Sequence, residues 1–325
     1  MTRVSRLAPS PTGSLHLGNA RTFLLNWAIA RQRGWRLVLR VEDLDGPRVK
    51  PESAADIEAT LQWLGMDWDG TTRVQSTDLS GYRRAMDFLA SAGRVYPCDL
   101  TRQQIEAAAS APQVGSGEVR FPPELRPLGF RMGCGGHEAG GEVGRVRFDS
   151  ARSWRLAVEP GVVMFEDDFA GPQAIDPSGT IGDFVVWTKR ETPAYQLAVV
   201  VDDAREGVTH VIRGDDLLDS AARQLLLYRA LGLGPEPQYG HLPLVVGPDG
   251  KRLAKRHGDT RVNAYRDAGV PAEAIVGLVA FWSGVQSTRA RLSARELVER
   301  LHTSRIPRSP VVFSSEDDQW LRTQA

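Results

Sequence analysis

Hydrophobic and polar positions in the N-terminal third of the chain predict strands and helices in alternation. An almost continuous apolar run over residues 35–41 is typical of a short buried strand. Apolar residues at helical spacing predict helices over residues 20–31, 52–64 and 82–92. This alternation predicts parallel strands, and therefore an α/β fold with a doubly wound sheet.

The pattern changes in the middle of the chain. From Tyr96 to about Asp183, glycines, prolines and short β-like runs replace the helical spacing. The β-like runs are residues 143–148 and 162–167, and the stretch 112–141 is rich enough in glycine and proline to predict loops. We therefore expect a subdomain inserted into the sheet fold.

Buried-strand character returns after the insert, at residues 184–187 and 197–201. A helix is predicted over residues 219–231 and a further strand over 242–246, which together would complete the sheet. The chain then reads as helices, at 272–281 and 294–301. The expected segments are 1–95 for the first half of the sheet domain, 96–183 for the insert, 184–260 for the second half and 261–325 for a helical segment.

Composition and charge limit the function classes. The chain has 325 residues, 25% charged and 42% hydrophobic, as is typical of a globular protein. Its 40 Lys and Arg residues balance 40 Asp and Glu residues, so an RNA partner would need local basic patches. The sequence shows neither an apolar signal core at its start nor a window long enough to span a membrane, and two cysteines make no secretory disulfide framework. We expect a cytoplasmic protein.

The most informative segment is residues 6–19, Arg-Leu-Ala-Pro-Ser-Pro-Thr-Gly-Ser-Leu-His-Leu-Gly-Asn. Pro9 and Pro11 favour an extended backbone, whereas Gly13 and Gly18 let the chain turn and approach a ligand closely. The predicted helix follows at once. A strand, turn and helix in this order point backbone N–H groups and the positive end of the helix dipole into the turn, which favours a phosphate there.

This segment resembles the first signature of the class I aminoacyl-tRNA synthetases, usually written His-Ile-Gly-His. Its flanking Ala-Pro-Ser-Pro-Thr-Gly is similar to the glutamyl branch of that family. The resemblance implies a Rossmann-type catalytic domain that uses ATP with Mg²⁺ and forms an aminoacyl adenylate. It also implies that His16, Gly18 and Asn19 contact the ATP phosphates, where preorganised donors stabilise developing charge.

The resemblance further implies a pocket for the amino acid L-glutamate. Its residues would be Arg6, Ala8, Ser10, Glu42, Tyr195 and Arg213. Arg6 would bind a substrate carboxylate, Glu42 the amino group, and Arg213 the side-chain carboxylate, a task that suits a planar guanidinium. Without the resemblance, Tyr195 would be interpreted as a core residue, whereas an isolated buried arginine is rare.

A basic loop, Lys-Arg-Leu-Ala-Lys-Arg-His-Gly at residues 251–258, follows the predicted strand at 242–246. It resembles the second class I signature, Lys-Met-Ser-Lys-Ser, which the glutamyl branch usually writes Lys-Leu-Ser-Lys-Arg. Arg252 and Ala254 depart from that pattern. Lys255 matches its second lysine, and would bind ATP phosphates and stabilise the departing pyrophosphate. Taken alone, such a loop is usually a solvated turn.

The insert resembles a region that, in short glutamyl-like enzymes, carries four ligands for zinc. At the matching positions this chain has Cys98, Leu100, Phe130 and Cys134. Because leucine and phenylalanine cannot ligate zinc, we expect no structural zinc and no other metal site. A substitute site remains as the alternative, and its ligands would be Cys98, Asp99, Cys134 and His137.

The chain ends at Ala325, soon after the second signature, so we expect no anticodon-binding domain. This resembles a short branch of the family that transfers glutamate to queuosine in the anticodon loop of aspartate tRNA. The implied partners are L-glutamate, ATP and the tRNA(Asp) anticodon stem-loop, and the implied state is a monomer. Contact with RNA would involve Arg145, Arg147 and Arg152, although a solvated run of charge is an equal interpretation.

Three alternatives remain at this point. The first is a glutamyl-tRNA synthetase that charges the 3′ end of glutamate tRNA without an anticodon domain. The second is a small-molecule nucleotidylyltransferase with the same turn, and the third is a non-catalytic RNA-binding relative. The joint presence of Arg6, Glu42, Arg213 and Lys255 argues against the third, since a protein that binds no amino acid does not need them.

Overall fold

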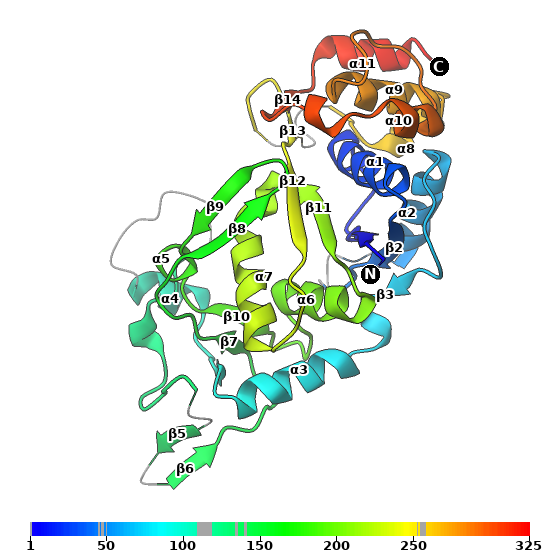
Figure 1. Ribbon diagram of the computed structural model, residues 1–325. Helices are drawn as coiled ribbons and strands as arrows, with labels where there is room; N and C mark the ends of the chain where they lie inside the picture. Colours follow the sequence, from blue (N-terminus) through cyan, green and yellow to red (C-terminus); the bar gives the residue numbers. More distant parts are fainter. Residues whose placement is uncertain are drawn as a thin grey trace.

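A computed structural model gives the fold of the chain (Figure 1). It describes residues 2–44, 46, 49, 51–108, 119–133, 136–139, 142–251, 253 and 258–325.

Two sets of parallel strands form the centre of the molecule. β1 (Val4–Leu7) pairs with β2 (Arg36–Val41), which pairs with β3 (Arg73–Val74). β11 (His210–Gly214) pairs in parallel with β12 (Gln238–Leu242). Together these strands confirm the predicted parallel sheet.

The side chain of Asn26 joins the two sets. At the start of β1, the Val4 backbone N–H donates to Thr209 Oγ1 at 2.9 Å. Further along, Asn26 Nδ2 donates to the carbonyl oxygens of Arg6, at 2.9 Å, and Ile212, at 3.4 Å. The amide therefore lies between β1 and β11, and the spatial order is β3-β2-β1-β11-β12. In a doubly wound sheet of this order, the ligand crevice opens where the order reverses, between β1 and β11.

The helices surround this sheet and extend it at one end. Their bounds are α1 (Leu17–Gln32), α2 (Pro51–Trp63), α3 (Ser80–Ser91), α4 (Arg102–Ala108), α5 (Pro177–Thr180), α6 (Tyr195–Glu206), α7 (Leu218–Ala230), α8 (Val262–Asp267), α9 (Ala272–Trp282), α10 (Ala294–Arg300) and α11 (Ser315–Arg322). Figure 1 shows α8 to α11 grouped beside α1 at one end of the molecule. In the part of the chain that is described, no helix is both long and apolar enough to cross a membrane.

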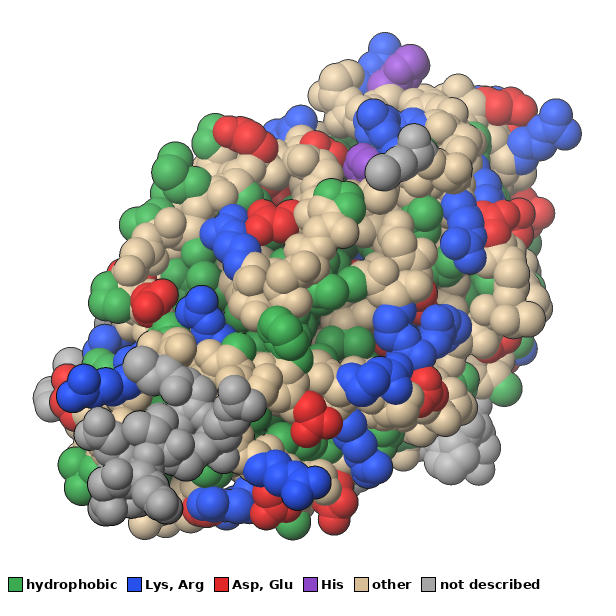
Figure 2. Space-filling view, turned by 60° about the horizontal axis from the view of Figure 1, so that its bottom comes forward, with side chains coloured by type: hydrophobic (Ala, Val, Ile, Leu, Met, Phe, Trp, Pro, Cys, Tyr) green, Lys and Arg blue, Asp and Glu red, His purple; other side chains and the backbone are tan. Residues whose placement is uncertain are grey.

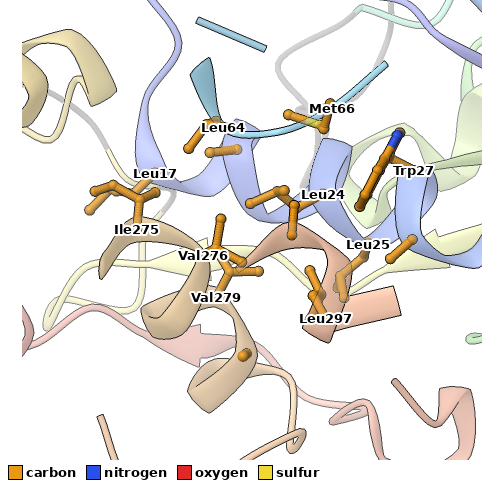
Figure 3. Close-up of a cluster of buried hydrophobic side chains, with 14 of the residues drawn as sticks. Leu17, Leu24, Leu25, Trp27, Leu64, Met66, Ile275, Val276, Val279 and Leu297 are labelled. Carbon is orange, nitrogen blue, oxygen red and sulfur yellow. The ribbon is translucent and has the colours of Figure 1, made fainter. Parts of the chain in front are cut away.

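The largest hydrophobic core joins the first and last segments of the chain. Figure 3 shows Leu24 and Leu25 of α1 pointing toward Val276 and Val279 of α9 and Leu297 of α10. All five side chains are buried. Burial of such side chains contributes about 1.5–3 kcal/mol each, so this contact fixes α1, and with it the turn before α1.

The remaining strands belong to three smaller groups and one extension. Their bounds are β4 (Val95–Pro97), β5 (Gly136–Ala139), β6 (Glu142–Arg145), β7 (Trp154–Leu156), β8 (Val163–Asp167), β9 (Gly171–Ile175), β10 (Phe184–Trp187), β13 (Val245–Val246) and β14 (Val311–Val312). The strands β4, β7 and β10 form an antiparallel sheet, and β5 pairs with β6. The hairpin β8–β9 lies within the segment expected to be the insert, yet it continues the sheet of β11 and β12 through Tyr239 and Asp167.

The run 197–201 shows one wrong prediction. It is not a strand but lies inside α6, so Tyr195 begins a helix and does not flank a strand. Every residue of α6 from Gln196 to Asp203 is buried, and a helix buried on most sides produces an apolar run without periodicity. Gly207, in the left-handed conformation (φ 69°), ends this helix.

Two other strand predictions were misplaced at their ends. The predicted strand 242–246 is interrupted, because β12 ends at Leu242 and only Val245–Val246 continues, in a separate pair with β14. Pro243 lies between them and cannot donate to a ladder. In the run 143–148, the strand β6 ends at Arg145. The helices and strands predicted at 20–31, 35–41, 52–64, 82–92, 162–167, 184–187, 219–231, 272–281 and 294–301 are confirmed within a few residues.

Candidate active site

The first signature forms the turn between β1 and α1. His16 is the N-cap residue of α1, in an extended conformation, and its ring lies over Gly18. A Cβ atom at Gly18 would approach the imidazole Cε1 and Nδ1 to 3.2 Å, so a larger residue there would press against the ring. Asn19 follows in the first helical turn, half-buried. His16 and Asn19 therefore flank the positive end of the helix dipole, as expected of a phosphate site.

The segment that follows the basic loop is bound to this turn. The Leu17 N–H donates to the Thr260 carbonyl at 2.9 Å, and the Val262 N–H donates to the Leu15 carbonyl at 2.8 Å. His16 and Arg261 form an antiparallel bridge between these bonds. The segment just after the second signature thus meets the first signature, although more than two hundred residues separate them. Lys255 itself, with Arg252 and Ala254, lies outside the described residues.

Arg6 and Glu42 lie on neighbouring strands in a buried cluster of charges. Arg6 is 4% exposed, and its Nε lies 3.5 Å from Asp203 Oδ1. Glu42, at the end of β2, is 7% exposed and accepts a hydrogen bond from Arg40 Nη2 at 3.2 Å. Burial raises the pKa of Glu42, although Arg40 and Arg6 oppose the rise. A cationic ammonium group beside Glu42 would favour its ionised form.

Arg40 organises the carboxylates beneath these two residues. Its Nη2 donates to Asp203 Oδ1 and its Nη1 to Glu206 Oε2, each at 2.7 Å. Asp202 completes the cluster, with its Oδ2 at 4.0 Å from Arg40 Nε. The cluster has two buried arginines and four carboxylates including Glu42, and the more exposed Arg73 and Arg205 pair with Glu206 and Asp202 at its edge. Sequence reasoning missed this cluster, because Asp202, Asp203 and Glu206 lie on the helix that was predicted as a strand.

Tyr195 lies at the first position of α6, at the mouth of a groove of about 450 Å³. The residue is 40% exposed, yet burial and the charge of Glu42 raise the pKa of its hydroxyl, while Arg213 and Arg6 lower it. Glu42, Arg213 and Arg6 thus lie near enough to Tyr195 for their charges to act on its hydroxyl, so the four predicted residues share one region.

The groove continues from Tyr195 to the inserted segment. Its lining includes Arg155, Asp183 and Arg223, together with the apolar side chains of Leu100 and Ile105. Arg155 lies over the ring of Phe121 with 4.2 Å between its Cζ and the ring centroid. A groove with several arginines and exposed apolar surface suits a nucleobase and its phosphates.

Arg213 is buried at 5% exposure and is held by three hydrogen bonds. Its Nε donates to His241 Nε2 at 2.9 Å, its Nη1 to Gln224 Oε1 at 2.9 Å, and its Nη2 to the Leu217 carbonyl at 3.1 Å. His241 in turn bonds to Asp167. Sequence reasoning missed His241 and Asp167. The sequence signal for Asp167 was its position at the end of the predicted strand 162–167.

The two remaining members of the predicted glutamate pocket lie in the loop after β1. Ala8 is half-buried, whereas Ser10 is exposed and its carbonyl accepts from the Thr12 N–H at 2.8 Å. The carbonyl of Pro9 accepts from the Glu42 N–H at 3.0 Å, which fixes this loop beside the end of β2.

Hydrophobic packing occupies the region where the family resemblance implied zinc. Cys98 is buried, and Leu100 and Phe130 pack against the cluster that contains it, Tyr96 and Phe121. Tyr96 and Phe130 rings lie 4.8 Å apart. Cys134 and the side chain of His137 lie outside the described part of the chain. Within the described part, no three His, Cys, Asp or Glu residues group as a metal site. These side chains do not fit the expected four-ligand set.

Comparison with known proteins identifies the family of the chain. A family model described as "tRNA synthetases class I (E and Q), catalytic domain" matches residues 3–320. The chain belongs to this family. Solved structures agree with the fold: the chain is similar to a glutamate tRNA ligase from Elizabethkingia meningosepticum, in complex with its amino acid. The TM-score is 0.78 at 25% identity, covering 99% of this chain and 69% of that one.

Curated relatives within the family fall into two groups. The chain is 45% identical to a glutamyl-Q tRNA(Asp) synthetase from Symbiobacterium thermophilum, over 96% of both chains. It is also 45% identical to one from Rhodopirellula baltica, over 97% of this chain and 98% of that protein. A glutamate–tRNA ligase from Oleidesulfovibrio alaskensis is 37% identical, and the match covers 66% of its length.

Proposed function

We propose that this protein activates L-glutamate with ATP, without requiring tRNA, and transfers it to queuosine in the anticodon loop of aspartate tRNA. The meeting of Arg6, Glu42, Tyr195 and Arg213 at the crevice carries the first half of the proposal. Two cationic guanidinium groups and one carboxylate match the two carboxylates and one ammonium group of glutamate. The family of the chain supports ATP as the second substrate.

In the proposed reaction, the α-carboxylate oxygen attacks the α-phosphorus of ATP in line. The new bond is the acyl–phosphate bond, and the bond to pyrophosphate breaks. His16 and Asn19 would stabilise negative charge on the phosphoryl oxygens, and Lys255 would stabilise pyrophosphate, while Mg²⁺ enters as part of the substrate. Since no side chain acts as a nucleophile, positioning and electrostatics provide the rate enhancement.

The acceptor is inferred from the relatives and from the groove. The relatives matched over nearly their whole length bear the glutamyl-Q name. The groove with Arg155 and Arg223 begins at Tyr195, where an adenylate would present its acyl group. Figure 2 shows Lys and Arg side chains in several separate groups on one face. Such local groups offer contacts for RNA on a protein whose net charge is zero. We propose the four predicted segments as its working units and a cytoplasmic monomer as its state.

Two measurements test the proposal separately. ATP–pyrophosphate exchange should depend on L-glutamate and proceed without tRNA; strict dependence on added tRNA would contradict the activation step. Transfer should require the cis-diol of queuosine, so mild periodate oxidation of the tRNA should abolish it. Because periodate also oxidises the cis-diol of the 3′-terminal ribose, aspartate tRNA without queuosine is the second substrate. If that tRNA accepts glutamate, the acceptor is instead the 3′ end of a tRNA, the activity named for the ligase relatives at 36–37% identity.

A further inference from the structure

A chain of hydrogen bonds connects Asp167, His241 and Arg213 through the strand ends of β8, β12 and β11. His241 Nδ1 lies 2.6 Å from Asp167 Oδ2, and Arg213 Nε lies 2.9 Å from His241 Nε2. His241 and Arg213 are register partners on adjacent parallel strands. All three residues are at most 5% exposed. Their relative positions are therefore set by the sheet.

Only one state of His241 satisfies both of its neighbours. A guanidinium has N–H groups and no acceptor, so His241 Nε2 must accept from Arg213. The imidazole hydrogen then lies on Nδ1, which donates to Asp167. Burial lowers the pKa of His241, and Arg213 lowers it further against the effect of Asp167, so the ring is neutral at physiological pH.

Asp167 is fixed as an ionised acceptor. Its Oδ1 accepts backbone N–H groups from Phe169 at 3.0 Å, Ala170 at 2.8 Å and His241 at 2.9 Å. Burial alone would raise the pKa of Asp167, but the bonds from His241 and Ala170 outweigh it and lower the pKa to about 2. With Oδ1 occupied, only Oδ2 faces the imidazole.

The three bonds made by Arg213 do not use all of its donors. They use one N–H on each nitrogen, and a guanidinium carries five. One N–H on Nη1 and one on Nη2 are therefore left to donate to a carboxylate.

We propose that Asp167 and His241 are positioning residues that orient Arg213 toward the side-chain carboxylate of glutamate. Asp167 selects the imidazole tautomer, and that tautomer accepts from Arg213 Nε and fixes the rotation of the guanidinium. The inference rests on the proposed role of Arg213 in binding glutamate.

Asp167→Asn tests the tautomer directly. The amide oxygen would take the three backbone N–H groups, so the amide N–H₂ would face His241 Nδ1. The imidazole hydrogen would then move to Nε2 and oppose the N–H of Arg213. We expect the KM for glutamate in ATP–pyrophosphate exchange to rise about 10-fold to 100-fold, with the KM for ATP unchanged. Asp168→Asn is the matched control, because Asp168 is exposed and bonds to Gln238.

Two substitutions of His241 provide a second test. The side-chain oxygen of His241→Gln can still accept from Arg213, whereas His241→Leu offers no acceptor. We expect His241→Gln to retain glutamate affinity within a few-fold and His241→Leu to lose about 10-fold or more. A purely structural role would affect glutamate and ATP kinetics alike.

Nitrogen-15 NMR of the histidine rings gives a readout that needs no activity. The His241 signals should report hydrogen on Nδ1 in the parent protein and on Nε2 in Asp167→Asn. An unchanged tautomer, or equal glutamate KM values in Asp167→Asn and Asp168→Asn, would overturn the inference. If the tautomer moves as expected but the parent protein does not activate glutamate, the proposed function is what fails.

Discussion

Arg40 and Asp203 form a buried ion pair, with 2.7 Å between Nη2 and Oδ1 and neither residue more than 2% exposed. The same Asp203 oxygen lies 3.5 Å from Arg6 Nε, so one carboxylate lies between two arginines. Asp203 thus connects Arg6, which we propose binds glutamate, to Arg40, which is not among the proposed glutamate-binding residues.

We expect Arg40→Leu to destabilise the protein strongly. Removal of Arg40 would leave Asp203, Glu206 and Glu42 buried without their shared cation, which costs about 3–5 kcal/mol when one partner of a buried pair is lost. Urea unfolding measures the change. Arg73→Leu is the control, because Arg73 touches the same cluster more weakly: its side chain is 42% exposed and its Nε lies 3.5 Å from Glu206 Oε1. An equal loss of stability in both variants would contradict the prediction.

Arg213→Ala should abolish glutamate activation and spare ATP binding. A desolvated carboxylate would lose a charge-assisted contact, and breaking such a pair costs about 2–5 kcal/mol. Glutamate-dependent pyrophosphate exchange and a separate ATP-binding measurement give the two readouts. Arg229→Ala serves as the control, since Arg229 lies near the surface and bonds to Glu236. An unchanged KM for glutamate in Arg213→Ala would exclude Arg213 from the pocket.

Gly18→Ala should lower kcat for adenylate formation. The added methyl group would approach the His16 ring to 3.2 Å and displace it from the phosphate site. Loss of a single stabilising donor typically lowers kcat about 100-fold to 1000-fold. We expect His16→Ala to show this full loss, and Gly18→Ala to lose no more than His16→Ala. Because both substitutions act through the same ring, the double variant should be no slower than His16→Ala. Additive effects would show that Gly18 acts by another route.

The purified protein should contain no stoichiometric zinc. Leu100 and Phe130 pack in the apolar cluster around Cys98, and a structural zinc needs four ligands. Elemental analysis of protein purified without a chelator tests this. About one zinc per chain would indicate the substitute ligand set, with Cys134 and His137.

Stability should fall as the pH is lowered from about 6.5 toward 4, partly through His210. Burial, with Arg3 and Arg33, lowers the pKa of His210 from 6.5 to about 4, so the unfolded chain binds its proton first. The contribution is therefore fully present above pH 6.5 and is lost on acidification. Urea unfolding between pH 7.5 and 4.5 should show a shallower decline for His210→Gln than for the parent protein. Parallel declines would contradict the assignment.

The sequence by itself determined the alternation of strand and helix, and through its signatures the identity of the site. Residues 6–19 are contiguous, so their strand, turn and helix follow from local proline and glycine chemistry and the spacing of apolar residues. Arg6, His16 and Glu42 could be named because each lies in or next to such a local pattern.

Only the tertiary structure decided which separate segments meet. Residues 197–201 are helical, although their apolar run predicts a strand. Burial on most sides of α6 removes the helical periodicity that would have identified the helix in the sequence. The antiparallel bridge between His16 and Arg261 joins residues more than two hundred positions apart in the sequence. The chain of hydrogen bonds from Arg213 through His241 to Asp167 depends on the register of three strands, and no local preference encodes that register.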